Sequence, residues 1–430
     1  MPTTPAEFAA QLANPMGCYY LFAAAANGVA AGMVWKHKNR IKSLVWMLFV
    51  LGFGLLGLTA FRGSPLQLPG GMKTAIDAVC TPAELTLAFF AAFSLCFLAR
   101  AFFVKPAVVW IGFNGAILFF GASLTDSNFF AAAMRPDDVP IVALVFLLGF
   151  FLWLALYQAV LNDRRLAIGW QPVEKDYSAR VLVWPDLVYS ELICMIALST
   201  VLIVWSLVLR APLEQPANPA ITPNPSKAPW YFVGLQELLA FSDAWNVGVL
   251  VPALAILGLA AIPYLDRNPT GSGYYSLRGR RFACFVFLFG FLQLWILQIL
   301  IGTFLRGPNW SYFGLYEVRD PSKLLPLEHL AVAQVFWTNI LGRPLPQAPL
   351  SARGGTDLLY FLYRDFPGVI LTVLYFLALP PLLGRTVMKN HRRSLGLIRF
   401  YLMTFLLLYM LTLPLKMLLY WVFGLDSLFG

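Results

Sequence analysis

Ten strongly apolar segments constrain this chain more than any other feature of its sequence. Each is close to the roughly 20 residues that a helix needs to cross the hydrocarbon core of a membrane. Because unpaired backbone groups are costly in lipid, helices are the expected form of these spans. The sequence therefore predicts an all-α fold, a polytopic membrane helical bundle of about ten transmembrane helices. The segments are 17–35, 43–61, 85–104, 107–123, 139–161, 187–209, 247–265, 282–305, 368–384 and 396–422.

The composition agrees with a membrane protein and excludes several soluble classes. Of the 430 residues, 59% are hydrophobic and 12% are charged, whereas soluble domains are about half apolar and about a quarter charged. The net charge of +10 would suggest nucleic-acid binding in a soluble protein. Here the basic residues gather in short loops between spans, as the positive-inside rule describes, so no nucleic-acid partner is predicted.

The basic loops also predict how the chain crosses the membrane. Loops rich in Lys and Arg lie on the inner side by the positive-inside rule, and successive loops must alternate. With ten spans, both termini and the loop 210–245 are then expected outside. The predicted inner loops are 36–42, 100–105, 163–180, 266–281 and 385–393; the predicted outer loops are 62–84, 126–138, 210–245 and 306–366.

A proline-rich stretch stands between the sixth and seventh apolar segments. Five prolines fall between Pro216 and Pro229, and Trp230, Tyr231 and Phe232 follow directly. Proline fixes φ and removes a backbone donor, so this stretch is expected to form a rigid, extended loop. Such a loop, followed by aromatic residues and held between two spans, is suited to forming the wall of a pocket at the membrane surface.

The residues of this loop carry a resemblance to a known family. They read Pro216-Ala217-Asn218-Pro219, Thr222-Pro223 and Ala228-Pro229-Trp230-Tyr231. This order resembles the quinol-oxidation loop of the cytochrome b family, most closely that of its split C-terminal piece, subunit IV of the plastoquinol-oxidising complex. The family pattern ends in Pro-Glu-Trp-Tyr, so Pro229 stands where the family has a glutamate.

Shorter matches outside the loop set the predicted domain boundaries. Trp184-Pro185-Asp186-Leu187 resembles the entry to the first span of subunit IV, Ile262–Asp266 the end of its second span, and Arg306–Trp310 the segment after its third. Four regions are predicted on this basis. They are an N-terminal five-helix membrane region of unknown role (1–165), an inside polar linker (166–185), a cytochrome b C-terminal (subunit IV-like) domain with the outer quinone-site loop 210–245 (186–310), and an outer loop with two C-terminal membrane helices (311–430).

The resemblance implies a function that the chain performs only within a complex. It implies a membrane subunit of a respiratory or photosynthetic cytochrome bc-type complex, which oxidises quinol, reduces cytochrome c and translocates protons across a bacterial inner membrane. The implied partners are a haem-bearing cytochrome b N-terminal subunit, a Rieske iron–sulfur protein, a c-type cytochrome and lipids, in a dimeric complex. The chain is then a quinol:cytochrome c oxidoreductase subunit that is not catalytic alone.

The histidines and cysteines predict that metal cofactors belong to those partners. A bis-histidine haem needs His on facing helices, but His37, His329 and His391 all lie in loops. The five cysteines are scattered without a Cys-x-x-Cys pair, so c-type haem, zinc and iron–sulfur spacings are missing. The only cofactor expected at this chain is quinone or quinol, in a shared site, with haem b and the iron–sulfur centre on partner chains.

The predicted outer quinone site contains Pro229, Trp230, Tyr231 and Phe232. By position alone, Trp230 and Tyr231 are also typical of the aromatic belt at a membrane interface. The resemblance implies instead that Tyr231 borders the quinol headgroup, where its hydroxyl can form a hydrogen bond.

Glu237 is the candidate proton acceptor, because Pro229 has no proton to exchange. If 230–240 is a short helix, residues seven apart share a face, and Glu237 then lies on the face of Trp230. A carboxylate within reach of the quinol can act as general base. Asp243 and Glu214 are weaker candidates, and Glu237 can equally be a polar residue on the helix surface.

Asp186 and Glu191 are the candidate residues of a second, inner quinone site. Both lie near the start of the sixth apolar segment, where the helix dipole favours acids, so a role limited to the helix end is the alternative. The resemblance implies that Asp186 lies near the inner quinone-reduction site. Glu191 lies deeper, where a charge in lipid is costly and is often functional.

Two other functions remain open at the level of sequence. The chain could be a membrane transporter, although transporters typically contain inverted repeats and helices broken at mid-membrane, and neither feature stands out here. It could also be an assembly or scaffold subunit whose quinone pocket is degenerate, as the proline at position 229 suggests.

Overall fold

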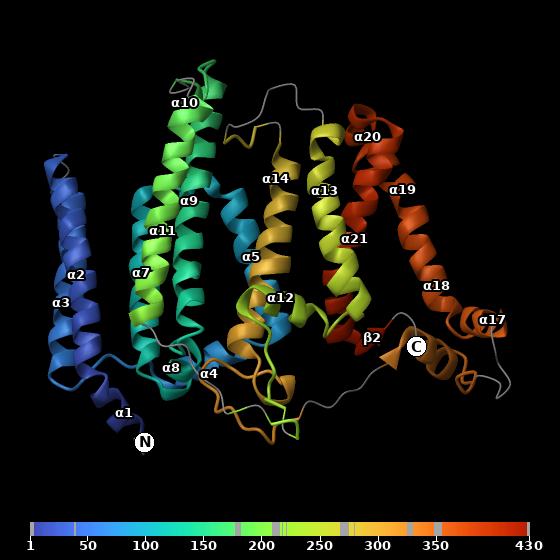
Figure 1. Ribbon diagram of the computed structural model, residues 1–430, viewed down its shortest axis with the longest axis horizontal. Helices are drawn as coiled ribbons and strands as arrows, with labels where there is room; N and C mark the ends of the chain where they lie inside the picture. The colour runs from blue at the N-terminus through green and yellow to red at the C-terminus, as the bar shows by residue number, and fades with distance from the viewer. Residues whose placement is uncertain are drawn as a thin grey trace. The chain divides into compact units, whose positions relative to one another are not determined.

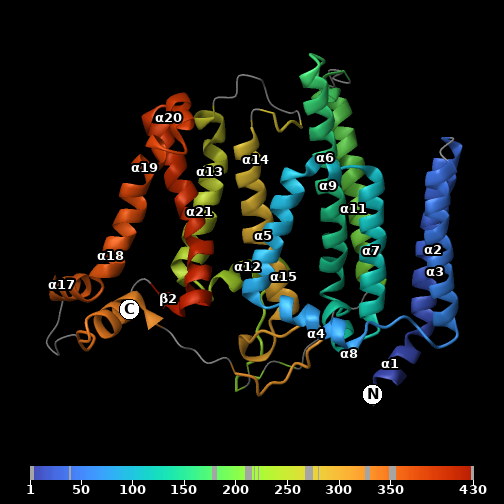
Figure 2. The same cartoon turned by 180° about the vertical axis from the view of Figure 1, so that it is seen from behind.

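The computed structural model is built almost entirely of helices (Figure 1, and from behind in Figure 2). It describes residues 4–37, 40–176, 182–208, 216, 218–220, 222–266, 275–278, 280–324, 330–347 and 355–427. Within these residues the only strands, β1 (Leu330–Ala331) and β2 (Leu425–Ser427), pair in parallel. The predicted all-α fold is confirmed.

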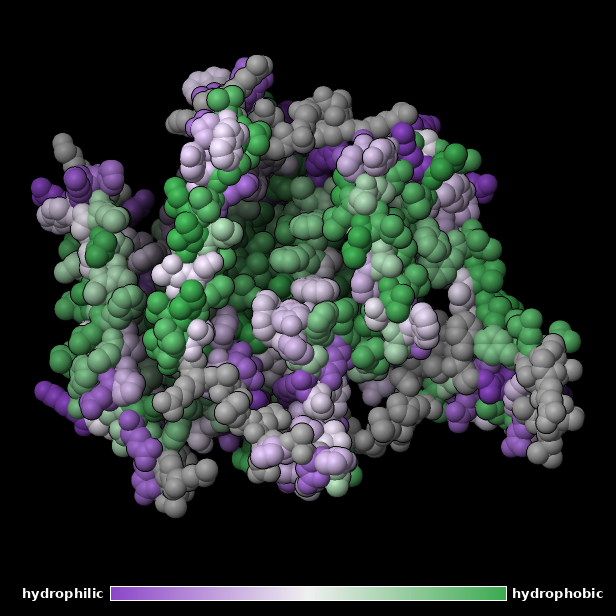
Figure 3. Space-filling model, viewed as in Figure 1, coloured by the Kyte–Doolittle hydropathy of each residue, from purple (hydrophilic) through white to green (hydrophobic). Residues whose placement is uncertain are grey.

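Every one of the ten predicted spans corresponds to a helical segment. Within the described part of the chain, nine helical segments are long and apolar enough to cross a membrane, and the pair formed by α4 (Gly70–Val79) and α5 (Pro82–Leu98), bent by 85°, makes a tenth if the pair is counted as one broken span. Hydrophobic side chains cover the helices between more hydrophilic ends, as the pair α2 and α3 illustrates (Figure 3). The chain is a multi-pass membrane protein. The nine segments are 13–36, 40–61, 106–124, 139–167, 183–208, 246–265, 281–305, 366–385 and 397–423.

The chain folds into two compact units whose borders differ from the predicted regions. The first unit comprises Met1–Ser226, Gly273–Phe285 and Thr303–Ser322; the second comprises Lys227–Ser272, Val286–Gly302 and Lys323–Gly430. The N-terminal helices thus share a unit with both ends of the helical segment 281–305. The division predicted from the sequence, which rests on family resemblance, stays a prediction.

The first unit contains the helices of the N-terminal half. They are α1 (Pro5–Gln11), α2 (Ala13–Lys36), α3 (Arg40–Phe61), α4, α5, α6 (Arg100–Phe103), α7 (Pro106–Leu124), α8 (Ser127–Ala133), α9 (Val139–Ala167), α10 (Val173–Asp176), the π-helix η1 (Val183–Leu187), α11 (Val188–Val208) and the 3₁₀ turn η5 (Pro308–Trp310). Helix α14 (Arg281–Leu288) begins here.

Small residues bring α2 and α3 close together. A Cβ atom at Gly17 would lie 2.7 Å from the ring of Phe61, so a larger residue there would displace this ring. Ala23 and Ala24 are buried. In lipid, close backbone approach replaces the hydrophobic effect as the source of helix association.

Two buried asparagines join α2 to α7. The Nδ2 of Asn27 donates to Oδ1 of Asn114 over 2.6 Å, and Trp110 donates its ring N–H to Oδ1 of Asn27 over 2.9 Å. Both asparagines are about 1% exposed. Polar side chains that satisfy each other between membrane helices contribute to their association, so this pair fixes the register of the two helices.

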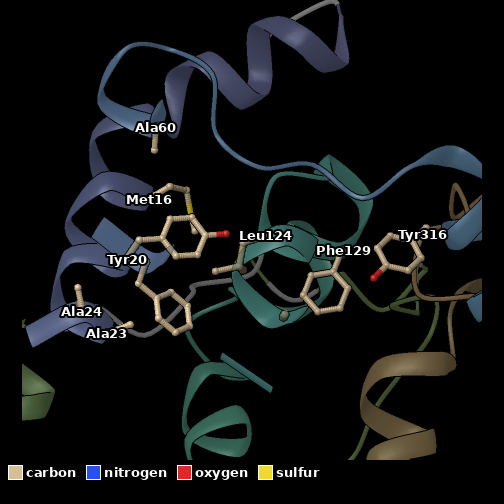
Figure 4. Packing of buried hydrophobic residues seen from close by; sticks show 10 residues of the cluster. Met16, Tyr20, Ala23, Ala24, Ala60, Leu124, Phe129 and Tyr316 are labelled. Carbon is tan, nitrogen blue, oxygen red and sulfur yellow. The ribbon is translucent and has the colours of Figure 1, made fainter. Parts of the chain in front are cut away.

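Tyr316 joins the long predicted outer loop to the N-terminal helices. Its hydroxyl lies 2.7 Å from Oγ of Ser123, its backbone N–H donates to Asp77 over 3.1 Å, and its ring stacks on Phe129 (Figure 4). Burial raises the pKa of the Tyr316 phenol above its ordinary value. Segments from the predicted outer loops 62–84, 126–138 and 306–366 therefore meet at the same end of this unit.

At the opposite end, α9 holds the segment that precedes α14. Oδ1 of Asp163 accepts from Oγ of Ser276 over 2.8 Å and from the backbone N–H groups of Leu277 and Arg278 over 3.1 and 2.9 Å. Asn162, fully buried, donates to the carbonyl oxygen of Tyr275 over 2.7 Å. Two loops that were predicted to lie inside thus bind each other.

The second unit contains the remaining elements. They are α12 (Trp230–Leu238), η2 (Asn246–Leu250), α13 (Val251–Leu265), η3 (Phe289–Ile296), α15 (Leu297–Leu300), β1, α16 (Val332–Gln334), η6 (Val335–Ile340), α17 (Gly355–Arg364), α18 (Phe366–Val373), η7 (Leu374–Ala378), α19 (Leu379–Arg385), α20 (Lys389–Leu395), α21 (Leu397–Phe423) and β2. The π-helix η4 (Ile301–Leu305) follows α15. Phe241, just after α12, packs edge-on against Tyr420 and Trp421 of α21.

Candidate functional site

A short helix begins immediately after the proline-rich loop. Helix α12 starts at Trp230, with Pro229 as its N-cap residue, and ends at Leu238. The backbone N–H of Ala228 donates to Oε1 of Gln236 over 2.7 Å, which folds the residues before the helix back along it. The hypothesis that Glu237 accepts a proton required a helix over 230–240. The helix is present over all of this range except its last two residues.

One face of α12 packs closely against the helical segment η3–α15–η4. A Cβ atom at Gly234 would lie 2.9 Å from Cγ1 of Ile299 and 3.4 Å from the carbonyl oxygen of Trp295. One at Gly302 would lie 3.1 Å from the carbonyl oxygen of Val233. Two glycines, one from each partner, therefore allow this close approach.

Glu237 lies on the packed face. It is 0% exposed, alongside the buried residues Val233, Gly234 and Leu238. The opposing segment also buries polar side chains: Gln298, 1% exposed, donates from Nε2 to the carbonyl oxygen of Gln293 over 3.3 Å. Buried polar and ionisable groups in a membrane protein are costly and are often functional. The contact between α12 and this segment is therefore a candidate functional site.

The aromatic residues at the start of α12 stay accessible. Trp230, Tyr231 and Phe232 are 44%, 48% and 52% exposed. Their rings form a continuous row, with centroids 5.7 Å apart between Trp230 and Tyr231 and 4.8 Å apart between Tyr231 and Phe232. A flat ligand therefore has aromatic surface available at this end of the helix.

The structure separates the predicted site residues into an exposed and a buried group. At about 100° per residue, Glu237 is within about 20° of Trp230 around the helix but about 120° from Tyr231. The shared face predicted for Trp230 and Glu237 follows from the helix. The carboxylate itself, however, lies in the helix contact, whereas the rings are accessible, so the role of Glu237 as proton acceptor stays a prediction.

An asparagine pair, which the sequence reasoning missed, holds the proline-rich loop within the first unit. Nδ2 of Asn224 donates to Oδ1 of Asn309 over 2.8 Å, and the backbone N–H of Asn309 donates back to Oδ1 of Asn224 over 2.6 Å. The side chain of Asn309 also donates to the carbonyl oxygen of Pro321 over 2.7 Å. Two segments that carry the family resemblance, 222–225 and 306–310, are thereby joined.

Arg306 organises the second of these segments. Its guanidinium is 3.6 Å from the ring centroid of Tyr312, and it donates to the Tyr312 hydroxyl over 2.8 Å and to the carbonyl oxygen of Trp310. Asn309 and Trp310 have φ values of 58° and 54°, in the left-handed region that non-glycine residues rarely adopt. Such backbone persists where its surroundings determine it strongly, and here Arg306 and Asn224 supply those contacts.

The two inner candidates lie apart from any enclosed site in the described chain. Asp186, in η1, and Glu191, in α11, are both exposed. None of the residues of α11 is buried by the described chain. Their predicted role at an inner quinone site stays a prediction.

The described residues provide no group of three His, Cys, Asp or Glu side chains that could hold a metal ion. His37 follows α2 and His391 lies in α20. His329 and Glu214 lie outside the described residues.

Comparison with known proteins identifies one part of the chain. Residues 216–306 match the family described as cytochrome b(C-terminal)/b6/petD. The match runs from the proline-rich loop through α12 to Arg306 and contains the packed and the aromatic residues described above. The resemblance predicted from the loop motifs is therefore confirmed for this segment. No solved structure matches the chain.

Proposed function

We propose that the chain, whose residues 216–306 match the cytochrome b C-terminal family, is a membrane subunit in electron transfer and a subunit IV-like component of a cytochrome bc-type complex. In this proposal it forms part of the quinol-oxidation site and supports quinol to cytochrome c electron transfer coupled to proton translocation. The observation that carries the proposal is the accessible aromatic row, Trp230 to Phe232, which directly follows the proline-rich loop of the matched domain.

The proposed site performs a reaction in which quinol becomes quinone and releases two protons and two electrons. The exposed aromatic rings at the start of α12 contact the headgroup, and the Tyr231 hydroxyl forms a hydrogen bond to a quinol oxygen. Pro229 fixes the start of the helix that presents them. Glu237 accepts one proton in the place of the family's loop glutamate. A Rieske iron–sulfur protein and b haem on partner chains would accept the two electrons.

The residues of this chain do not fit a b haem of its own. Two histidines on facing helices would be needed, and within the described residues His37 and His391 lie outside the ten spans. The haem-bearing chain is therefore a partner. In the same way the exposed α11, with Asp186 and Glu191, offers a surface for an inner quinone site that a partner completes.

We expect the chain, separated from its partners, to show no b- or c-type haem absorption. The whole complex should show b haem, and separation of its subunits should assign that haem to another polypeptide. A reduced-minus-oxidised spectrum of each separated subunit measures this. A b-type peak that stays with this chain would contradict the proposal that a partner chain holds the haem. It would not contradict the family match of residues 216–306.

The proposed location is a bacterial inner membrane with the aromatic row on the outer, positive side. Support comes from the first unit, where parts of the predicted outer loops meet at one end and parts of two predicted inner loops meet at the other. Both termini then lie outside. Protons released by quinol at the outer side contribute directly to the transmembrane gradient.

Cysteine labelling tests this orientation. In a variant without the five native cysteines, a cysteine at Ser242 should react with a membrane-impermeant maleimide from the outside. A cysteine at Ser394 should react only after the inner face is opened. The reverse pattern would place the aromatic row on the inner side and remove the basis for proton release outside.

The N-terminal helices have a proposed structural role. Tyr316 joins them to the segment after the third cytochrome b-like span, and Asp163 joins them to the segment before it. We propose that they brace this span from both ends. A transporter function gains no support from these contacts.

A scaffold subunit with a degenerate pocket is the second candidate, because Pro229 replaces the family's acid. Normal turnover of a Glu237→Gln variant would favour it if a photoreactive azidoquinone also failed to label the aromatic row.

A further inference from the structure

A cavity of about 430 Å³ lies in the first unit, at the end opposite Tyr316. It lies between the end of α5 and the start of α6, the last turns of α9, and the segment that leads into α14. Neither the proposed quinone site nor the matched family's loop motifs involve these elements. Its walls come from three parts of the chain that are far apart in sequence.

Four arginines line this cavity. They are Arg100, Arg164, Arg278 and Arg281, and the single acid among the lining residues is Asp163. Oδ1 of that acid accepts three hydrogen bonds from residues 276–278, which positions Arg278 at the cavity. Four guanidinium groups against one carboxylate give the cavity a strongly positive field.

The other wall of the cavity is apolar. Leu98, Ala101, Val160 and Ala167 line it. Leu98, Val160 and Ala167 lie near the ends of the apolar helices α5 and α9. Leu98 is 76% exposed. A cavity with a basic rim and an apolar wall at the end of membrane helices matches a molecule that has an anionic head and an apolar body.

From this geometry we propose that the cavity, named here the arginine cavity, binds the phosphate headgroup of an anionic phospholipid. Guanidinium groups present planar, paired donors that match phosphate oxygens. Basic cavities between membrane helices on the cytoplasmic side are suited to anionic lipid headgroups. The acyl chains would extend from Leu98 along the exposed apolar surface of α5.

The positive-inside rule alone does not explain the arrangement. That rule requires basic residues in the inner loops, and it is satisfied wherever in a loop they stand. Here arginines from 100, 164 and 278–281 converge on one cavity, and Asp163 forms three hydrogen bonds that hold one of them there. A bound lipid would then join α5, α9 and the start of α14.

The test uses the intact complex, purified in detergent and freed of bound lipid. Native mass spectrometry measures the affinity for added dioleoyl phosphatidylglycerol, with dioleoyl phosphatidylcholine as the zwitterionic comparison. Each basic residue contributes roughly five-fold to binding of an anionic lipid surface. The double variant Arg164→Gln/Arg278→Gln should therefore bind phosphatidylglycerol about thirty-fold more weakly.

Matched controls separate this site from general charge. Arg385→Gln/Arg393→Gln removes the same charge from exposed arginines of a predicted inner loop outside the cavity, and its affinity should stay unchanged. Arg164→Lys/Arg278→Lys keeps the charge and should retain most of the binding. That result would show that substitution at these two positions does not by itself unfold the cavity.

Three results would overturn the proposal. The first is an equal loss of affinity in both Gln double variants. The second is equal binding of phosphatidylcholine and phosphatidylglycerol. The third is displacement of the lipid from the complex by millimolar inorganic phosphate, which would make the cavity a site for the free anion.

Discussion

Glu237→Gln is expected to slow quinol oxidation by the complex by about 10²- to 10⁴-fold, the usual effect of losing a general base. Bound quinol must give up its protons, and Pro229 cannot accept one. Glu237 is the acid within the helix that begins at Trp230, and it is held there fully buried. Glutamine has almost the same shape, so assembly and haem content should stay normal.

The measurement is steady-state quinol:cytochrome c turnover across the pH range. Glu84→Gln, which neutralises an exposed acid in the first turn of α5, serves as the matched control and should turn over normally. Glu237→Asp keeps a carboxyl group and should recover part of the rate. Unchanged turnover of Glu237→Gln at every pH would show that the proton leaves by another route, with Asp243 and Glu214 as the remaining candidates.

Gly234→Val is expected to separate α12 from α15 and to abolish most quinol oxidation. The new Cβ would lie 2.9 Å from Cγ1 of Ile299 and 3.4 Å from the backbone of Trp295 and Ile299, so α12 must move. Overpacking of this kind costs about 1–3 kcal/mol. The displaced helix would carry both Glu237 and the aromatic row out of position.

Gly258→Val is the matched control, because it adds the same side chain to α13 at a position with nothing within 4 Å. Valine has a higher helix propensity than glycine, so this variant should be as stable as the native chain. Thermal unfolding of the purified complex, together with turnover, compares the two. Equal stability and activity of both variants would mean that the α12–α15 contact does not position the site.

The spans and the aromatic helix could be predicted because local patterns determine them. An apolar run of about 20 residues specifies a membrane helix by its length and composition, and all ten runs are helical. Proline at 229, followed by residues with no further proline until after α12, likewise indicates where α12 begins. These features need no knowledge of distant parts of the chain.

Contacts between distant residues could not be predicted in this way. Asn224 and Asn309 are 85 positions apart, and nothing in either loop alone indicates the pair. The helix period placed Glu237 on the face of Trp230. It did not reveal that Glu237 is buried while Trp230 stays exposed. Gln293 and Gln298 were visible signals, because polar residues within an apolar span are uncommon.

The central claim is that the aromatic row at the start of α12 borders bound quinol. Photoaffinity labelling of the active complex with an azidoquinone, followed by peptide mapping, tests it most directly. We predict that the label attaches within Trp230–Phe232 and that excess quinol prevents it. A complex that oxidises quinol while the label attaches only to other chains would contradict the claim.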